Sequence, residues 1–302
     1  MKLEFKPIQI TDRPLFQPIL HSAPELGCEY TFGNLFSWRN VYDTSAAVTP
    51  DGMLIVRFEK DVGEGGAYLF PVGSGDLKSA VSSMLEYSVE KKEKFTIIAA
   101  RREDVEALNS LFGDIFICHT SRDFAEYVYN STDLINLAGK KYHAKRNHIS
   151  RFDIDNPGYK FCEITAENLP RVREMSERWY DEVIAGESAG STLPEERQSA
   201  DEIFKNYFEL GLSGGFVETA EGIVAYSMGE PICDSTFCVH IEKAKYDVAG
   251  AYTVINRDFA AYFCGDYQYI NREDDVGDEG LRRSKLSYYP VCVTEKFVVH
   301  LK

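Results

Sequence analysis

The segment from Asn271 to Tyr288 combines residue types that an acyl transfer requires. Moving an acyl group to an amine or hydroxyl needs a base for the nucleophile's proton, hydrogen-bond donors for the developing oxyanion, and an acid for the leaving group. Glu273 and Asp275 are candidate bases, provided that burial raises the pKa of the carboxyl group, and Tyr288 is a candidate acid. We therefore predict that these three residues are catalytic.

The same segment offers groups that could hold an anionic substrate. Arg282 and Lys285 are three positions apart, so a helix would present them as a cation pair. Glycines at the start of this expected helix let backbone N–H groups approach a ligand closely. The predicted binding residues of the segment are Asn271, Arg272, Gly277, Gly280, Arg282 and Lys285. The alternative is a structural cluster, in which the acids at 273–279 cap the helix and pair with the arginines.

A second group of candidate binding residues lies in the middle of the chain. Residues 136–152 hold five Lys or Arg, two His and no acid, although the protein carries a net charge of −15. Lys and Arg form charge-assisted hydrogen bonds with phosphate and carboxylate groups. Lys141, His143, Lys145 and Arg146 are therefore predicted to bind phosphates or the 3′ adenosine end of a tRNA. The alternative is a helix whose basic face is simply solvated.

Both segments resemble the signature of a known family. The stretch Gly139-Lys-Lys-Tyr-His-Ala-Lys-Arg-Asn147, followed by Phe152, and the stretch from Tyr269 to Pro290 are similar to bacterial proteins grouped with the C-terminal domain of phosphatidylglycerol lysyltransferase. The resemblance spans essentially the whole chain. It implies two fused domains of the GNAT-type acyltransferase fold. It also implies an N-acyl or aminoacyl transferase, with aminoacyl-tRNA or acyl-CoA as candidate donor and a small or lipid-derived amine or hydroxyl as acceptor.

The sequence gives little support to other kinds of site. An ordinary coenzyme A loop, Q/R-x-x-G-x-G/A, is reduced to Gly250-Ala251, which argues against acetyl-CoA as the donor. No metal site is predicted, because the acids at 273–279 lack the ligand order of a calcium loop and no H-E-x-x-H spacing occurs. His240, in the middle of an expected strand, is interpreted as a satisfied core residue.

Charge and hydropathy limit the classes of partner. Because 33 Lys and Arg face 48 Asp and Glu, the surface is not broadly basic. DNA is therefore not an expected partner, and a tRNA would be held by a local patch or by its 3′ end alone. No run approaches the ~18–20 apolar residues of a membrane-spanning helix. The expected compartment is the cytoplasm, where the seven cysteines would be reduced.

The order of the predicted elements positions both groups of candidate residues. Apolar periodicity and turn residues predict an α/β order twice along the chain. One domain is expected at residues 1–135 and another at 136–302, with the basic segment 137–152 at their junction. A strand is expected at 267–271 and a helix at 278–288. The catalytic candidates would thus lie where a strand ends and a helix begins, the usual ligand end of an α/β sheet.

The sequence thus predicts an α/β fold with two tandem GNAT-like domains, whose mixed sheets are flanked by helices. The preferred function is an acyl or aminoacyl transferase. Two alternatives stay open: a non-catalytic module that binds an anionic small molecule, and a coenzyme A-dependent N-acetyltransferase. Whether the two candidate segments meet in one cleft is a question for the tertiary structure.

Overall fold

The computed structural model describes residues 2–22, 27–60, 65–120, 122–186 and 192–302. The chain divides into two compact units, and neither is one continuous stretch. The first unit holds residues 1–126, 274–277 and 293–302, and the second holds residues 127–273 and 278–292. Each unit is built on a β-sheet of its own. None of the helices in the described ranges is long and apolar enough to cross a lipid bilayer.

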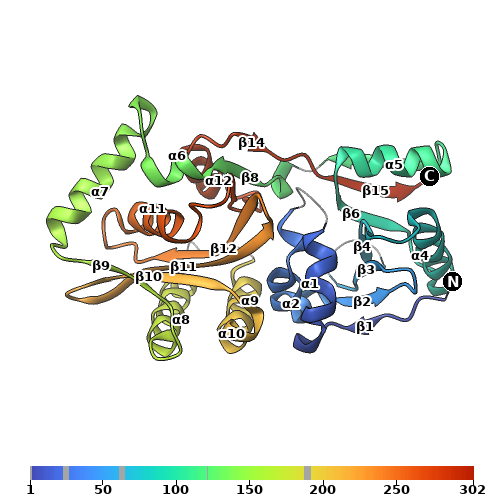
Figure 1. Ribbon diagram of the computed structural model, residues 1–302, viewed down its shortest axis with the longest axis horizontal. Helices are drawn as coiled ribbons and strands as arrows, with labels where there is room; N and C mark the ends of the chain where they lie inside the picture. Colours follow the sequence, from blue (N-terminus) through green and yellow to red (C-terminus); the bar gives the residue numbers. More distant parts are fainter. Residues whose placement is uncertain (1, 23–26, 61–64, 121, 187–191) are drawn as a thin grey trace. The chain divides into compact units, whose positions relative to one another are not determined.

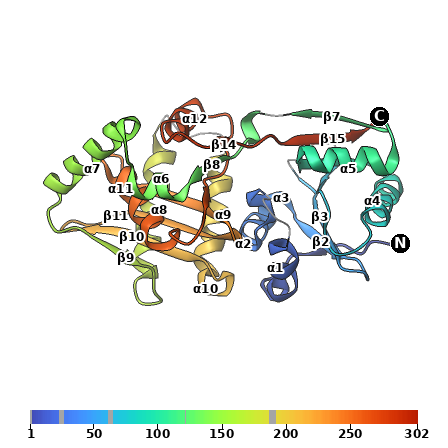
Figure 2. The same cartoon turned by 45° about the horizontal axis from the view of Figure 1, so that its top comes forward.

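The sheet of the first unit mixes parallel and antiparallel strands. β4 and β6 run parallel, and the other neighbouring strands run antiparallel. Figure 2 shows β7 and β15 side by side at one edge, with α5 beside them. In spatial order the strands are β1 (Lys6–Pro7), β2 (Ser45–Val48), β3 (Met53–Phe58), β4 (Ala67–Leu69), β6 (Thr96–Ala100), β15 (Phe297–Leu301) and β7 (Phe116–Thr120), and β5 (Val72–Gly73) pairs with β3.

The helices of the first unit cover this sheet with apolar side chains. Asp76 caps α4 by accepting the Ser79 N–H at 2.6 Å. Val81 and Met84 of α4 are fully buried against strand residues in the core. The helices are α1 (Arg13–His21), α2 (Phe32–Ser37), α3 (Arg39–Tyr42), α4 (Leu77–Lys91) and α5 (Arg102–Phe112), with 3-10 turns η1 (Ile10–Asp12), η2 (Cys28–Tyr30) and η3 (Arg122–Phe124).

The sheet of the second unit carries the segments that the sequence singled out. In spatial order its strands are β14 (Cys292–Val293), β8 (Tyr127–Asn130), β13 (Tyr269–Asn271), β12 (Thr236–Ala244), β11 (Gly222–Cys233), β10 (Ser213–Thr219) and β9 (Lys160–Glu163). β12 and β13 run parallel, and β9, β10, β11 and β12 pair antiparallel in that order. In Figure 1, α11 lies on one face of this sheet, and α8 and α9 lie on the other.

The helices of the second unit begin at recognisable signals. Asn168 accepts the Thr165 N–H at 2.8 Å, and Pro170 occupies the first turn of α8, as its sequence predicts. Trp179 of α8 is buried, and its indole N–H donates to the Ala244 carbonyl at 2.9 Å. The helices are α6 (Ser131–Asn136), η4 (Lys140–Tyr142), α7 (His143–Asp155), α8 (Leu169–Ala185), α9 (Leu193–Lys205), α10 (Tyr207–Leu210), α11 (Ala251–Phe263) and α12 (Glu279–Leu286).

The predicted α/β class is confirmed, because both units are mixed sheets flanked by helices. The sequence did not indicate where the last strand would pair. β15 lies between β6 and β7 in the sheet of the first unit. The division at residue 135 remains a prediction about domain boundaries.

Candidate active site

β12 and β13 diverge in the sheet of the second unit. Their parallel pairing covers three residue pairs, from Thr236 with Tyr269 to Cys238 with Asn271, although β12 continues to Ala244. β12 beyond Cys238 is therefore not paired with β13. Side chains from β12, from the residues after β13 and from α7 and α11 gather at this divergence.

A buried ion pair joins the two diverging segments. Arg272, the residue after β13, donates from Nη2 to Glu242 of β12 at 2.7 Å. The other oxygen of Glu242 accepts from Asn256 of α11 at 3.1 Å. Arg272 Nη1 and Asn256 Oδ1 are also buried, and neither has a hydrogen-bond partner among the described residues. The pair thus leaves one donor and one acceptor unsatisfied, which is costly unless a ligand completes them.

Lys145 of α7 brings a second cation to the Arg272 side of this cluster. Its Nζ lies 3.7 Å from the ring centroid of Tyr288 and donates to Ser287 Oγ at 2.7 Å. Arg272 lies 5.1 Å from the same ring. In the described part of the chain, no carboxylate lies within ion-pair distance of Lys145. Two cations therefore share a single carboxylate, Glu242.

The surroundings of Lys145 and Tyr288 change their proton affinities. Burial and then the charge of Arg272 lower the pKa of Lys145 to about 8, although Glu242 opposes this shift. Burial raises the pKa of Tyr288 to about 12. The Tyr288 phenol therefore keeps its proton at neutral pH. The Lys145 amine loses its proton around pH 8.

Titration of Lys145 is expected to give a pKa near 8, against about 10.4 in model peptides. NMR of the reductively ¹³C-methylated protein measures it, with Lys145→Arg assigning the signal. Arg272→Gln should raise this pKa and Glu242→Gln should lower it, since the first removes a repelling charge and the second an attracting one. The unfolded chain binds the proton more tightly, so stability should rise with pH between 8 and about 10.4. A pKa near 10.4 in the folded protein would contradict the burial of Lys145.

Glu273 takes part in a second polar cluster on the same strand. His240 of β12 lies between two carboxylates, with Nδ1 2.8 Å from Glu273 Oε1 and Nε2 3.1 Å from Glu230 Oε1. The Cys238 thiol donates to Glu273 Oε1 at 3.8 Å. Glu273 has a left-handed backbone (φ 57°), and its N–H donates to Asn271 Oδ1 at 2.8 Å. Asn271 thus orients Glu273.

The left-handed backbone explains how two successive residues reach the same strand. Successive side chains of a regular strand point to opposite faces. Arg272 and Glu273 nevertheless contact Glu242 and His240, which are two positions apart on β12. The pairing of β11 with β12 also skips a residue at His240, which is a β-bulge. These two irregularities aim the side chains of both segments at the divergence.

α12 follows this segment and contacts the site through the side chain of Lys285. Asp278 caps α12 by accepting the Leu281 N–H at 2.6 Å, which leaves Gly280 inside the first turn. Lys285 is buried, and its ammonium donates to the Arg272 carbonyl at 2.6 Å. Arg282 is half-buried on the same helix. Lys285 therefore holds the Arg272 backbone in place, and a role for Arg282 in substrate binding remains a prediction.

Asp275 and Gly277 belong to the first unit. Asp275 is fully buried, lies 3.4 Å from Arg122, and accepts the Gly277 N–H at 3.0 Å. The Asp275 carboxylate thus closes a turn onto the Gly277 N–H. This is what the alternative of a structural cluster of acids at 273–279 predicts. The catalytic role of Asp275 and the ligand-binding role of Gly277 stay predictions.

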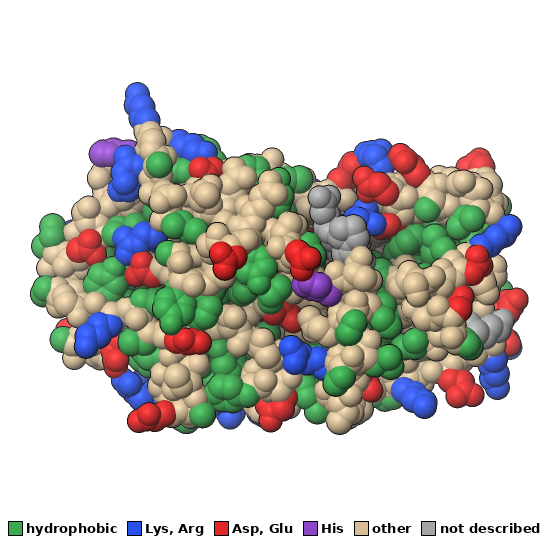
Figure 3. Space-filling model, viewed as in Figure 1, with side chains coloured by type: hydrophobic (Ala, Val, Ile, Leu, Met, Phe, Trp, Pro, Cys, Tyr) green, Lys and Arg blue, Asp and Glu red, His purple; other side chains and the backbone are tan. Residues whose placement is uncertain are grey.

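The other basic candidates lie at the start of α7. Figure 3 shows Lys and Arg side chains and a histidine gathered over this part of the second unit. Lys141 is exposed and pairs with Asp133 at 3.2 Å, and His143 is exposed and lies 3.4 Å from Asn147. These two residues are not part of the Arg272 cluster as described, and their phosphate-binding role remains a prediction.

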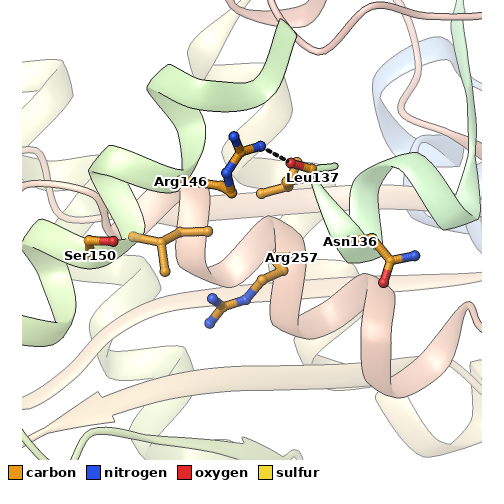
Figure 4. Close-up of a pocket in the computed structure, with 6 residues that line it drawn as sticks. Asn136, Leu137, Arg146, Ser150 and Arg257 are labelled. Carbon is orange, nitrogen blue, oxygen red and sulfur yellow. Dashed lines mark hydrogen bonds between the residues drawn. The ribbon is translucent and has the colours of Figure 1, made fainter. Parts of the chain in front are cut away.

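Arg146 lines a pocket of about 220 Å³ with Arg257 of α11 (Figure 4). Its guanidinium donates to the carbonyls of Leu137 and Gly139, at 2.5 and 2.8 Å. Arg257 donates to Tyr159 and Asp258. Both guanidinium groups are thus engaged within the protein, so the pocket is a weaker anion site than the divergence of β12 and β13.

Three residues of the site were missed at the level of sequence, namely Glu230, Glu242 and Asn256. None of the three belongs to a sequence motif. His240 was interpreted as a satisfied core residue, and both of its ring nitrogens have hydrogen-bond partners. A usable signal was the alternation of Cys238, His240 and Glu242, which share one face of an otherwise apolar strand. Polar residues that repeat at every second position of a buried strand are expected to have hydrogen-bond partners.

Two solved structures share the fold of this chain. A conserved protein of unknown function from Bacteroides thetaiotaomicron is similar over 99% of this chain and 100% of its own, with 37% identity and a TM-score of 0.92. L-PGS from Bacillus licheniformis is similar over 98% of this chain and 93% of its own, with 18% identity and a TM-score of 0.66, which shows a shared fold. No curated protein matches this chain.

The family described as "Phosphatidylglycerol lysyltransferase, C-terminal" matches residues 21–300. The match includes both segments from which the resemblance was predicted. Family and fold together suggest an aminoacyl or acyl transferase. The chain belongs to the family of phosphatidylglycerol lysyltransferase C-terminal domains.

Proposed function

We propose that the chain transfers an aminoacyl group from aminoacyl-tRNA to a small or lipid-derived amine or hydroxyl at the divergence of β12 and β13. The proposal is carried by the buried Nη1 of Arg272, which has no hydrogen-bond partner among the described residues. Lys145 adds a second cation, and Glu242 is the single carboxylate between them. A negatively charged or strongly polarised oxygen of a substrate would satisfy this arrangement.

The residues of the site suggest how the bonds would change. The acceptor nitrogen or oxygen attacks the carbonyl carbon of the aminoacyl ester, and the oxyanion is stabilised by Arg272 Nη1. Glu273 takes the proton that the acceptor loses. The ester bond then breaks, and the leaving hydroxyl of the tRNA receives a proton from Tyr288, whose phenol is protonated at neutral pH. Glu273 then releases its proton to solvent and the Tyr288 phenolate takes one up, so the protons balance.

The structure favours an aminoacyl donor over coenzyme A. Gly250 is one of the two residues that remain of a coenzyme A loop. A Cβ atom at Gly250 would lie 2.5 Å from the His148 carbonyl oxygen of α7. This glycine therefore permits close packing of two helices, which explains its presence without a pyrophosphate. Among the alternatives, binding of an anionic small molecule without turnover remains the competitor.

The experiment is a thermal-shift screen with charged tRNA, a hydrolysis-resistant 3′-aminoacylamino-adenosine, coenzyme A and acetyl-CoA. We expect the aminoacyl compounds to raise the melting temperature of the wild type, since a ligand stabilises the state that binds it. Lys145→Met should lose the effect, whereas the exposed Lys140→Met should keep it. Charged ³H-aminoacyl-tRNA is then incubated with amine and lipid acceptors.

Label appearing in an acceptor supports the transferase. Binding of the adenosine compound without any transfer supports the non-catalytic alternative, and stabilisation by acetyl-CoA alone supports the acetyltransferase. If none of the four compounds shifts the wild-type melting temperature, the site assignment is wrong.

A further inference from the structure

Three side chains of the second unit could bind one metal ion. Cys238, His240 and Glu273 each offer a ligand atom, and these atoms all lie within 4.8 Å of one another. Cys238 Sγ lies 3.6 Å from His240 Nδ1 and 3.8 Å from Glu273 Oε1, and the last two atoms are 2.8 Å apart. Thiolate, imidazole and carboxylate are the ligand types that zinc prefers.

The distances suit a tetrahedral metal centre. With Zn–S near 2.3 Å and Zn–N and Zn–O near 2.0–2.1 Å, ligand atoms of a tetrahedron lie roughly 3.3–3.6 Å apart. The two separations from Cys238 Sγ are within a few tenths of an ångström of this range. The separation of His240 Nδ1 from Glu273 Oε1 is shorter, as expected while a proton joins them. A metal that displaces this proton would open the pair by about half an ångström.

A fourth residue orients the histidine as metal sites require. Glu230 of β11 is buried, and its Oε1 lies 3.1 Å from His240 Nε2. Metal-ligating histidines commonly donate their other ring N–H to a carboxylate, which fixes the tautomer and raises the basicity of the ligating nitrogen. The bond to Glu230 would leave Nδ1 as the nitrogen that faces Cys238 and Glu273.

Backbone constraints hold the ligands together. A Cβ atom at Gly229 would lie 2.0 Å from the Cys238 carbonyl oxygen, so only glycine lets β11 approach β12 here. Glu273 adopts a left-handed conformation that non-glycine residues rarely take, at a cost of roughly 1 kcal/mol. Strain of this kind persists where the surrounding structure enforces it, and it is frequent at functional sites.

A second group of candidate ligands in the same protein already holds a cation. Cys28, Glu29 and Glu126 of the first unit also place their ligand atoms within 4.8 Å of one another. In that cluster the Lys296 ammonium contacts both carboxylates, so a cation already occupies the centre.

We propose that Cys238 Sγ, His240 Nδ1 and Glu273 Oε1 bind a divalent transition metal, zinc in the first place, with Glu230 as the hydrogen-bond partner of His240. Three protein ligands leave a fourth position for water or for a substrate oxygen or nitrogen. Binding displaces the thiol proton and the proton shared by His240 and Glu273. The metal would bind Oε1 of Glu273, which leaves Oε2 of the same carboxylate to take the proton of the acceptor.

The test measures metal content and needs no acyl donor, so its failure is distinct from failure of the proposed function. Tag-free protein is dialysed against buffered zinc, passed through a desalting column and analysed by inductively coupled plasma mass spectrometry. We expect about one zinc per chain in the wild type, since all three ligands come from one chain. Cys238→Ser and His240→Ala should lose it, and Glu230→Gln should weaken binding about 10–100-fold.

Cys264→Ser is the matched control, because Cys264 is also a buried free thiol but is not part of the cluster. Cobalt loading adds an independent readout. A thiolate-to-cobalt charge-transfer band should appear in the wild type and in Cys264→Ser, and should be absent from Cys238→Ser. Circular dichroism establishes that each variant is folded. Folded wild-type protein that retains no zinc and shows no cobalt band overturns the proposal.

Discussion

Replacing Lys296 with methionine is expected to lower the free energy of unfolding of the first unit by about 3–5 kcal/mol. Lys296 is buried and contacts Glu29 and Glu126, the latter at 2.8 Å. Glu126 is fully buried and also accepts the Cys28 N–H at 2.8 Å. Methionine removes the charge at similar side-chain length. Two carboxylates then remain in a site that disfavours their ionised forms, which is the large cost.

Each unit contains one of the two tryptophans, Trp38 in the first and Trp179 in the second. In a Trp179→Phe background, the fluorescence of Trp38 during urea denaturation therefore reports the first unit alone. Lys302→Met is the control, since Lys302 pairs with Asp114 at an exposed position and should matter by less than about 1 kcal/mol. Adding Glu126→Gln to Lys296→Met should recover part of the loss. A loss below 1 kcal/mol for Lys296→Met contradicts the described burial.

The direction of two pKa shifts supports this prediction. Burial beside Glu126 raises the pKa of Glu29, although the Lys296 charge opposes it. The Lys296 charge and the Cys28 hydrogen bond lower the pKa of Glu126 in spite of its burial. A carboxyl group with a lowered pKa stabilises the native state above its unfolded pKa, and this contribution is lost on acidification. The stability carried by Glu126 should therefore disappear in acid, and Lys296→Met should remove that dependence.

Replacing Arg272 with glutamine is expected to lower the transfer rate by about 10²–10³, if the transferase proposal is correct. Arg272 Nη1 is the buried donor without a partner, and the neutral side chain cannot stabilise an oxyanion to the same extent. Single-turnover transfer from charged tRNA measures the rate. Arg151→Gln is the control, because Arg151 is an exposed arginine of α7 that pairs with Asp155.

Loss of structure must be separated from loss of chemistry in this experiment. Arg272→Gln leaves Glu242 buried with Asn256 as its remaining hydrogen-bond partner, so the variant should also be less stable. The double variant with Glu242→Gln removes the uncompensated charge and should regain stability. If that double variant is stable and still inactive, Arg272 acts on the substrate. If it regains full activity, Arg272 serves only to neutralise Glu242, and the proposed role is wrong.

Local patterns predicted most of the helices and strands near the site. A strand was expected at 267–271 and is β13 at Tyr269–Asn271, and a helix was expected at 278–288 and is α12 at Glu279–Leu286. Apolar periodicity and capping residues are local signals, and the structure follows them because each helix buries one face. The family and the fold class were also predicted and are confirmed.

The candidate site was predicted in part. Lys145, Arg272 and Tyr288 were among the candidates, and the structure brings them together around one ring. Glu242 and Asn256 were not, since neither belongs to a sequence motif. The roles of the remaining candidates stay predictions, because no measurement of substrate binding distinguishes a cap or an ion pair from a ligand contact.

The amino-acid sequence alone therefore establishes the family, the α/β class and the pool of charged residues from which a site is built. These properties depend on composition and on neighbours within a few turns of chain. The pairing of β15 with β6 and β7, the unsatisfied Nη1 of Arg272 and the lowered pKa of Lys145 required the folded chain. Each depends on burial and on partners that are distant along the sequence, so no local pattern contains them.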